Sequence, residues 1–170
     1  MTPPRPASAS PATAVANAFL GAGAHDQRWL FQPADTGQII PVPLIVPVPF
    51  SCDWFAGLAA VRGQLYSVVD FSRFHGFDAT PIGPSSRLLL FSPERQLHTA
   101  LLFERIDGIL SAERFHRAPP RPALSPWICE HWQDSSDELW QQVDISALIN
   151  HSRFIESAAA AQAQAQEAAA

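Results

Sequence analysis

The sequence predicts an all-β protein with short helices, and three observations support this prediction. Most apolar runs are only four to six residues long, which is too short for a buried helix and typical of strands. Turn-forming residues bound each run, and prolines recur through the strand-like segments. An apolar fraction of 47% over 170 residues, with 11 Phe and 5 Trp, supplies enough apolar surface for the core of about one domain.

The predicted strands follow one another along the chain with turns between them. They are Ala16–Leu20, Trp29–Gln32, Leu58–Val61, Leu65–Val69, Leu88–Phe91, His98–Phe103 and Leu139–Val143. Their spacing is typical of a β-barrel or a β-sandwich. The segment Pro41–Phe50 is predicted as an extended crossover or an edge strand, because proline cannot donate to a sheet ladder. Gly63 is predicted as a hairpin or bulge position between two strands.

Two short helices are predicted between and after the strands. Asp70 is placed to cap the turn FSRFHG, because an aspartate carboxylate accepts from amides two or three residues further on. Gly76 is free to take the left-handed conformation that closes such a turn. Asp144 is placed in the same way before ISALINHSRFI, where Ile145 and Leu148 lie on one helix face.

Both ends of the chain differ in composition from the middle. Residues 1–14 are rich in Pro, Ala and Ser without periodicity, and such a segment cannot bury enough apolar area to offset its ordering entropy. We expect a disordered tail there. Residues 157–170 are rich in Ala and Gln and are predicted as a fraying helical or disordered tail.

The charge balance disfavours several classes of partner. A formal net charge of −5 provides no cluster of Lys and Arg for nucleic acid or for anionic lipid. No apolar stretch reaches the roughly 18 residues of a spanning helix, and the amino terminus lacks the pattern of a secretory signal. We therefore expect a cytoplasmic protein, in which Cys52 and Cys129 are buried free thiols.

The segment WFAGLAAVRGQLYSVVDFSRFHGF, residues Trp54–Phe77, resembles the core motif of the CheW-like chemotaxis adaptor family. That motif is a hydrophobic residue with Gly, a short strand, Arg-Gly, an apolar strand and Asp followed by a hydrophobic residue. The preceding VPVPFSCDWF, the strand pair Arg87–Leu110 and the closing ELWQQVDISALINHSRFI also fit in order and spacing. The resemblance defines one domain at residues 15–156. Its aromatic-rich details are most similar to the adaptors of type IV pilus chemosensory systems.

This resemblance implies a fold and a function. Proteins of the family fold as two packed, SH3-like, five-stranded β-barrels with a C-terminal helix. They have no active site and need no cofactor. They couple methyl-accepting receptors to a CheA-like histidine kinase, which here implies a scaffold for twitching-motility signalling, without nucleic acid or membrane insertion. Recruitment to membrane-associated receptor arrays follows from the receptor partner.

The resemblance also assigns roles to individual residues. It implies that receptor or kinase docks at Arg62, Gly63, Gln38, Ile39 and Val61, and that Gly57, Asp70 and Asp144 are structural. The family often has a Glu where this chain has Gln38, so an ion pair with Arg62 is not expected there, although Gln can accept a hydrogen bond. The alternative for Arg62 is a structural arginine that satisfies carbonyls or forms a surface ion pair.

A second functional class is a small-ligand-binding or metal-binding β-barrel without a chemosensory role. His116, Cys129 and His131 are zinc-ligand types, but their spacing matches no recognised zinc pattern. Asp70, Ser72 and His75 are the three residue types of a hydrolase triad, yet on one helical turn they point to different faces. No Gly-rich phosphate loop leads into a helix. An adaptor without catalytic residues is therefore the preferred interpretation.

Overall fold

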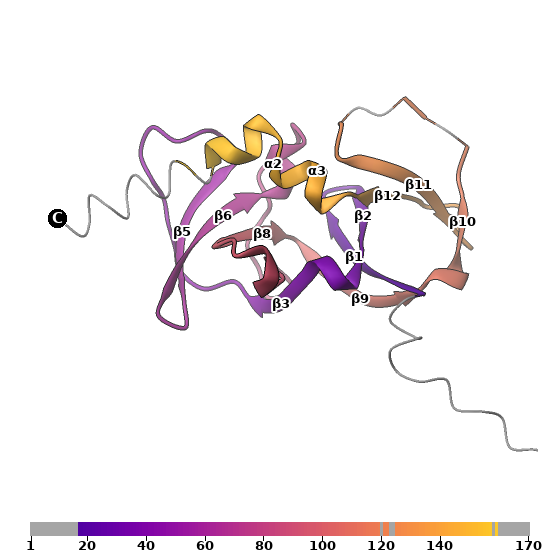
Figure 1. Cartoon of the computed structure of the whole chain (residues 1–170), viewed down its shortest axis with the longest axis horizontal. Helices are drawn as coiled ribbons and strands as arrows, with labels where there is room; N and C mark the ends of the chain where they lie inside the picture. The colour runs from indigo at the N-terminus through magenta and orange to yellow at the C-terminus, as the bar shows by residue number, and fades with distance from the viewer. Residues whose placement is uncertain (1–16, 120, 123–124, 158, 160–170) are drawn as a thin grey trace, which may run out of the picture.

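Two curled β-sheets that lie side by side form the protein (Figure 1). The computed structural model describes residues 17–119, 121–122, 125–157 and 159. Strands are the main regular structure of the described chain, and its helices are short, so the predicted all-β class is confirmed. None of the helices within those residues is both long and apolar enough to cross a membrane.

The first sheet joins the two ends of the described chain. Its strand order is β10-β11-β12-β2-β1-β9. The strands are β1 (Ala18–Ala24), β2 (Gln27–Phe31), β9 (Arg105–Ser111), β10 (Phe115–Arg117), β11 (Ile128–Asp134) and β12 (Leu139–Val143). Neighbours pair antiparallel except for β2 and β12, which are parallel. Because β2 and β12 are more than 100 residues apart, their pairing closes a long loop of chain that contains the whole second sheet.

The second sheet is built from the middle of the chain. Its order is β3-β7-β8-β6-β5-β4, with a parallel pair between β6 and β8. The strands are β3 (Thr36–Pro41), β4 (Ile45–Val46), β5 (Phe55–Val61), β6 (Gln64–Asp70), β7 (Arg87–Phe91) and β8 (Thr99–Phe103). Within Pro41–Phe50, Pro41 ends β3, and the one further strand is β4, which lies at the sheet edge, as the prolines predicted.

Each sheet has six strands, where the resemblance implied five. The additional edge strands β4 and β10 are only two and three residues long. Prolines limit β4 on both sides, since Pro43 and Pro47 cannot donate to a ladder. Such short edges leave few open backbone groups for pairing with another chain.

The helices follow the predicted caps. The Asp70 carboxylate accepts from the amides of Ser72 and Arg73 at the start of α2 (Phe71–Phe74). Asp144 accepts from Ala147 at the start of α3 (Ile145–Ile149). The described chain also has three 3-10 turns: Pro33–Asp35, Pro93–Arg95 and Ala112–Arg114.

The prediction of a single helix after Asp144 is wrong, because the helix is interrupted at Asn150 and His151. The Asn150 side chain donates to the carbonyl of Ser146 and ends α3. His151 Nδ1 then accepts from the amide of Arg153 and starts a second helical segment at residues 152–157. These local side-chain bonds compete with the helical ladder and interrupt it.

One hydrophobic core connects both sheets. Trp29 and Phe31 from the first sheet meet Phe103 from the second, with ring centroids 6.0 Å and 5.7 Å apart. Phe71 and Phe74 of α2 lie in the same cluster, together with Phe154. The helices α2 and α3 lie where the two sheets meet (Figure 1). Since core residues interlock at close packing, the two sheets form one unit.

Two further expectations concern the cysteines and the tails. The prediction of buried thiols is wrong for Cys129, which is exposed on β11, while Cys52 is half-buried; both are free. Strand β11 has a solvent face, so alternate side chains point outward there. The tail predicted at residues 1–14 lies outside the described residues. So does most of 157–170, of which Ser157 and Ala159 are described and helical.

Candidate functional site

The turn between β5 and β6 has an unusual residue at its tip. Val61 pairs with Gln64, so Arg62 and Gly63 form a two-residue hairpin loop. Both have positive φ, 50° at Arg62 and 81° at Gly63, which is the pattern of a type I′ turn. Gly63 therefore occupies the predicted hairpin position. A left-handed conformation costs a residue such as Arg about 1 kcal/mol or more, so turn formation does not explain Arg62.

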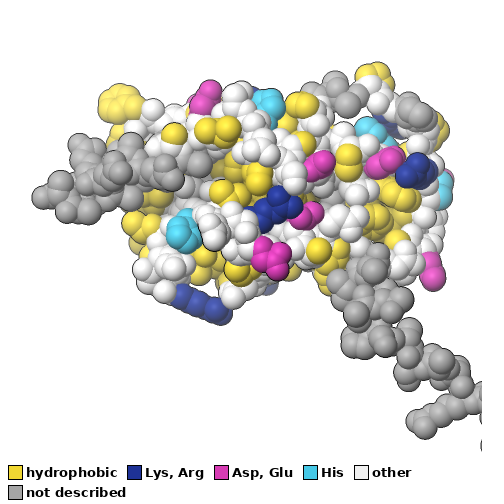
Figure 2. Space-filling view, in the orientation of Figure 1, with side chains coloured by type: hydrophobic (Ala, Val, Ile, Leu, Met, Phe, Trp, Pro, Cys, Tyr) yellow, Lys and Arg dark blue, Asp and Glu magenta, His cyan; other side chains and the backbone are white. Residues whose placement is uncertain are grey.

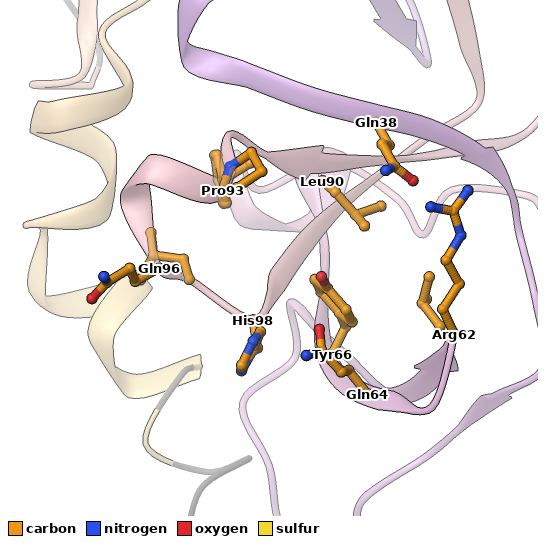
Figure 3. Close-up of a pocket in the computed structure, with 11 residues that line it drawn as sticks. Gln38, Arg62, Gln64, Tyr66, Leu90, Pro93, Gln96 and His98 are labelled. Carbon is orange, nitrogen blue, oxygen red and sulfur yellow. The ribbon is translucent and has the colours of Figure 1, made fainter.

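A groove of about 480 Å³ opens beside this turn (Figure 3). Its floor is apolar and includes Val61, Leu90 and Phe91, each no more than 8% exposed. Polar side chains surround the opening: Gln38, Arg62, Gln64, Gln96 and His98. Tyr66, Pro93 and Leu97 complete the lining. No carboxylate lines the groove, so Arg62 gives it a fixed positive charge.

The curl of the second sheet brings Gln38 to Arg62. Gln38 lies on β3, and Arg62 lies at the tip of the β5–β6 hairpin, near the other end of the strand order. The β3–β7 register shifts between Thr36 and Ile39, at the position of Gln38. Figure 3 shows the Gln38 amide and the Arg62 guanidinium pointing toward one another at the groove opening.

The Arg62 side chain has no polar partner among the described residues of the protein. Within those residues it makes no hydrogen bond and has no carboxylate within 4 Å. The alternative of a structural arginine that satisfies carbonyls is therefore not seen here. An exposed guanidinium can form two parallel hydrogen bonds to a carboxylate or to backbone carbonyls of a second molecule.

The predicted site residues fall into two groups, those at the groove and those away from it. Gln38, Val61 and Arg62 line the groove, while Ile39, 41% exposed, and Gly63 lie next to it. Gly57, Asp70 and Asp144 have structural positions outside the groove.

Gly57 has a position that only glycine fits. Its φ is 138°, and a Cβ there would lie 2.2 Å from the carbonyl oxygen of Val46. The β5–β6 register also shifts between Phe55 and Gly57, so a bulge brings the backbone of β5 close to β4.

The three residues of the suggested triad are not connected as a triad. Asp70 binds amides and the Thr80 hydroxyl. His75 Nδ1 donates to the carbonyl of Phe71, and Nε2 accepts from the Trp127 indole at 2.9 Å. The Ser72 hydroxyl has no partner among the described residues. Across the described part of the chain, no group of three or more His, Cys, Asp or Glu side chains could hold a metal ion.

Several groove residues were not predicted from the sequence. Gln64 and Tyr66 follow Arg62 at the two-residue period of a strand, and this signal could have found them. Leu90 lies on β7 and His98 directly precedes β8, and no local signal connects them to Arg62.

The chain belongs to the CheW-like domain family, whose sequence profile matches residues 19–153. This makes it a scaffold-type adaptor of chemotaxis-type signalling. It is similar to Protein PilI from Pseudomonas aeruginosa, with 25% identity over 128 residues, 73% of this chain and 70% of PilI. Its structure is similar to the crystal structure of the scaffolding protein TtCheW from Thermoanaerobacter tengcongensis, with a TM-score of 0.58. That match covers 75% of this chain and 88% of TtCheW at 12% identity, and it confirms the predicted CheW-like fold.

Proposed function

We propose that this protein is a non-enzymatic adaptor that couples a methyl-accepting receptor to a CheA-like histidine kinase. The similarity to PilI supports a type IV pilus chemosensory system as its setting. The observation that carries the proposal is the groove with its apolar floor and the uncommitted Arg62. An adaptor needs exposed surfaces that bind, and it needs no reactive group.

The groove suits the receptor as its partner. Apolar side chains of a receptor tip would be buried against Val61 and Leu90, and Arg62 would bind a carboxylate or carbonyl beside them. The glutamine side chains at the opening can both donate and accept hydrogen bonds, so they can bind either the N–H or the C=O groups of a partner's backbone.

The opposite face of the same hairpin suits the kinase. Leu65 and Val46 are 49% and 56% exposed. Val46 pairs with Leu58, and Ala60 pairs with Leu65, so all four side chains share one face of the sheet. Figure 2 shows hydrophobic side chains at the surface in the half of the molecule that holds β5 and β6. Because strand side chains alternate, Leu65 points away from Gln64 and Tyr66, and two partners can bind β6 at once.

The test is reconstitution with purified receptor signalling domain and kinase. Arg62→Ala is expected to weaken receptor binding about tenfold, because a charge-assisted hydrogen bond contributes about 1.5–3 kcal/mol. Leu65→Lys should reduce kinase binding and leave receptor binding intact. Arg114→Ala is the matched control, since Arg114 is exposed in the 3-10 turn of the first sheet.

Circular dichroism of each variant checks that the fold is kept. The proposal fails if folded Arg62→Ala couples receptor to kinase as well as the wild type. It also fails if the purified protein binds neither partner but binds a metal ion or a small metabolite saturably, as the ligand-binding alternative predicts.

A further inference from the structure

The loop before β5 presents one aromatic ring to solvent. Phe50 is 108% exposed, more than any other large apolar side chain of the described residues. Its φ is 60°, a left-handed conformation that costs a residue other than glycine about 1 kcal/mol or more. Ser51 Oγ donates to the carbonyl of Val48 at 2.8 Å, so a side-chain hydrogen bond holds this turn. A strained turn that exposes an aromatic ring indicates a surface that a second molecule covers.

A carboxylate follows the ring three residues later. Asp53 is exposed, and its side chain makes no hydrogen bond or ion pair with the described residues. Its backbone carbonyl accepts from the Arg73 guanidinium at 3.2 Å, and the carbonyl of Cys52 accepts the amide of Phe55. Residues 50–53, here named the Phe50 loop, therefore present an aromatic ring and a negative charge on one short segment.

The groove beside Arg62 has complementary features. Its floor is apolar, and its volume of about 480 Å³ suits an aromatic ring. Arg62 at the opening has no polar partner among the described residues, and no carboxylate lines the groove. A ligand with an aromatic ring and a nearby carboxylate would bury the ring and pair the arginine.

The Phe50 loop cannot reach the groove of its own chain. It directly precedes β5, while Arg62 directly follows the last residue of that strand. A strand of seven residues spans roughly 20 Å. The loop and the hairpin tip therefore lie at opposite ends of β5 (Figure 1). A contact between them has to join two molecules.

We propose that the Phe50 loop of one copy of this chain binds the groove of a second copy. Phe50 is buried against Val61 and Leu90 of the second copy, and Asp53 binds the Arg62 guanidinium. Two copies with antiparallel β5 strands make this contact twice, because each strand has a loop at one end and a groove at the other. Such a reciprocal contact gives a closed dimer with two-fold symmetry.

Charge favours a protein over other covers for the Phe50 ring. Asp53 lies next to the ring, and the chain has a net charge of −5, so anionic lipid and nucleic acid are both repelled. The contact does not depend on the receptor. If the receptor binds the same groove, as proposed above, the dimer and the receptor complex exclude each other.

Sedimentation equilibrium of the full-length protein from about 1 µM to about 1 mM tests this contact. The mass is expected to rise with concentration from the 18.5 kDa of one chain toward twice that value. Phe50→Asn should raise the dissociation constant about tenfold and keep the fold, because Asn adopts the left-handed conformation readily. Ile109→Thr is the matched control and should leave the dissociation constant unchanged, since Ile109 is 62% exposed on β9 of the first sheet.

Charge reversal tests which residues meet. Asp53→Arg and Arg62→Asp should each weaken self-association, and the chain with both substitutions should regain it, because the pair is restored with opposite signs. A protein that stays monomeric up to the highest concentration overturns the proposal. So does a dimer that Phe50→Asn leaves unchanged, or a double variant that does not recover. A monomeric chain that uses Phe50 to bind the purified kinase would also overturn it.

Discussion

The indole Nε1–H of Trp127 donates to Nε2 of His75 across 2.9 Å and connects the two sheets. His75 closes α2, which directly follows β6 of the second sheet, and Trp127 directly precedes β11 of the first. His75 Nδ1 is already used by the carbonyl of Phe71, so the ring must be neutral to accept from Trp127.

The first prediction concerns pH. Burial lowers the pKa of His75 from 6.5 to about 4, while the hydrogen bond to Phe71 opposes the shift and the charge of Arg153 adds to it. Between these values the unfolded chain binds a proton that the folded protein does not, so stability falls as pH falls. The loss is on the order of 3 kcal/mol from about pH 6.5 to about pH 4.

Urea unfolding at several pH values from about 4 to about 7.5 measures this loss. His75→Gln lacks the titrating ring, so the pH dependence of its unfolding free energy should be smaller by that amount. An identical slope in both proteins would assign the acid sensitivity to the other five histidines or to the carboxylates.

The second prediction compares the two helix-capping aspartates. Asp70 is buried and accepts four hydrogen bonds, from two helix amides and from the amide and hydroxyl of Thr80. Asp144 is exposed and accepts one, from Ala147. Asp70→Ala should lower the free energy of unfolding by about 3 kcal/mol, and Asp144→Ala by about 1 kcal/mol. Equal losses in urea unfolding would contradict the importance of Thr80.

The third prediction separates stability from binding at Arg62. Asn adopts the left-handed conformation readily, so Arg62→Asn should raise the free energy of unfolding by about 1 kcal/mol while receptor binding weakens. The thermal midpoint and the receptor affinity are measured on the same preparation. If stability and binding both fall, the hairpin conformation assigned to Arg62 is wrong.

The fourth prediction concerns the close approach at Gly57. Gly57→Ala places a Cβ 2.2 Å from the Val46 carbonyl oxygen, in a backbone conformation that side chains disfavour. The expected result is displacement of β4 and a loss of several kcal/mol in unfolding free energy. Gly83→Ala is the control, since a Cβ there meets no atom within 4 Å. A stable Gly57→Ala protein would show that β4 can move without cost.

Local sequence patterns predicted the caps and turns of the fold, but they did not predict the long-range contacts. The caps at Asp70 and Asp144 and the turn at Gly63 depend on residues within three positions, so the sequence reveals them. Strand β11 was missed because its half-exposed residues ICEHWQD contain no apolar run.

The candidate site was less accessible from sequence. The meeting of Gln38 with Arg62 depends on the curl of a six-stranded sheet, and the sequence indicated it only through family resemblance. The amide of Thr80 donates a hydrogen bond to Asp70 from 10 residues further along the chain, and no sequence periodicity predicts such a contact. The Ser72 hydroxyl has no hydrogen-bond partner among the described residues, and no sequence pattern predicts this.

The shared core has a mechanical consequence for an adaptor. Rings from both sheets interlock around Phe71, so neither sheet can swing relative to the other without opening close-packed aromatic contacts. Two proteins bound to different surfaces of this chain would be held at a fixed spacing and orientation. A displacement of one would then be passed to the other with little attenuation, as through a stiff spacer in a lattice.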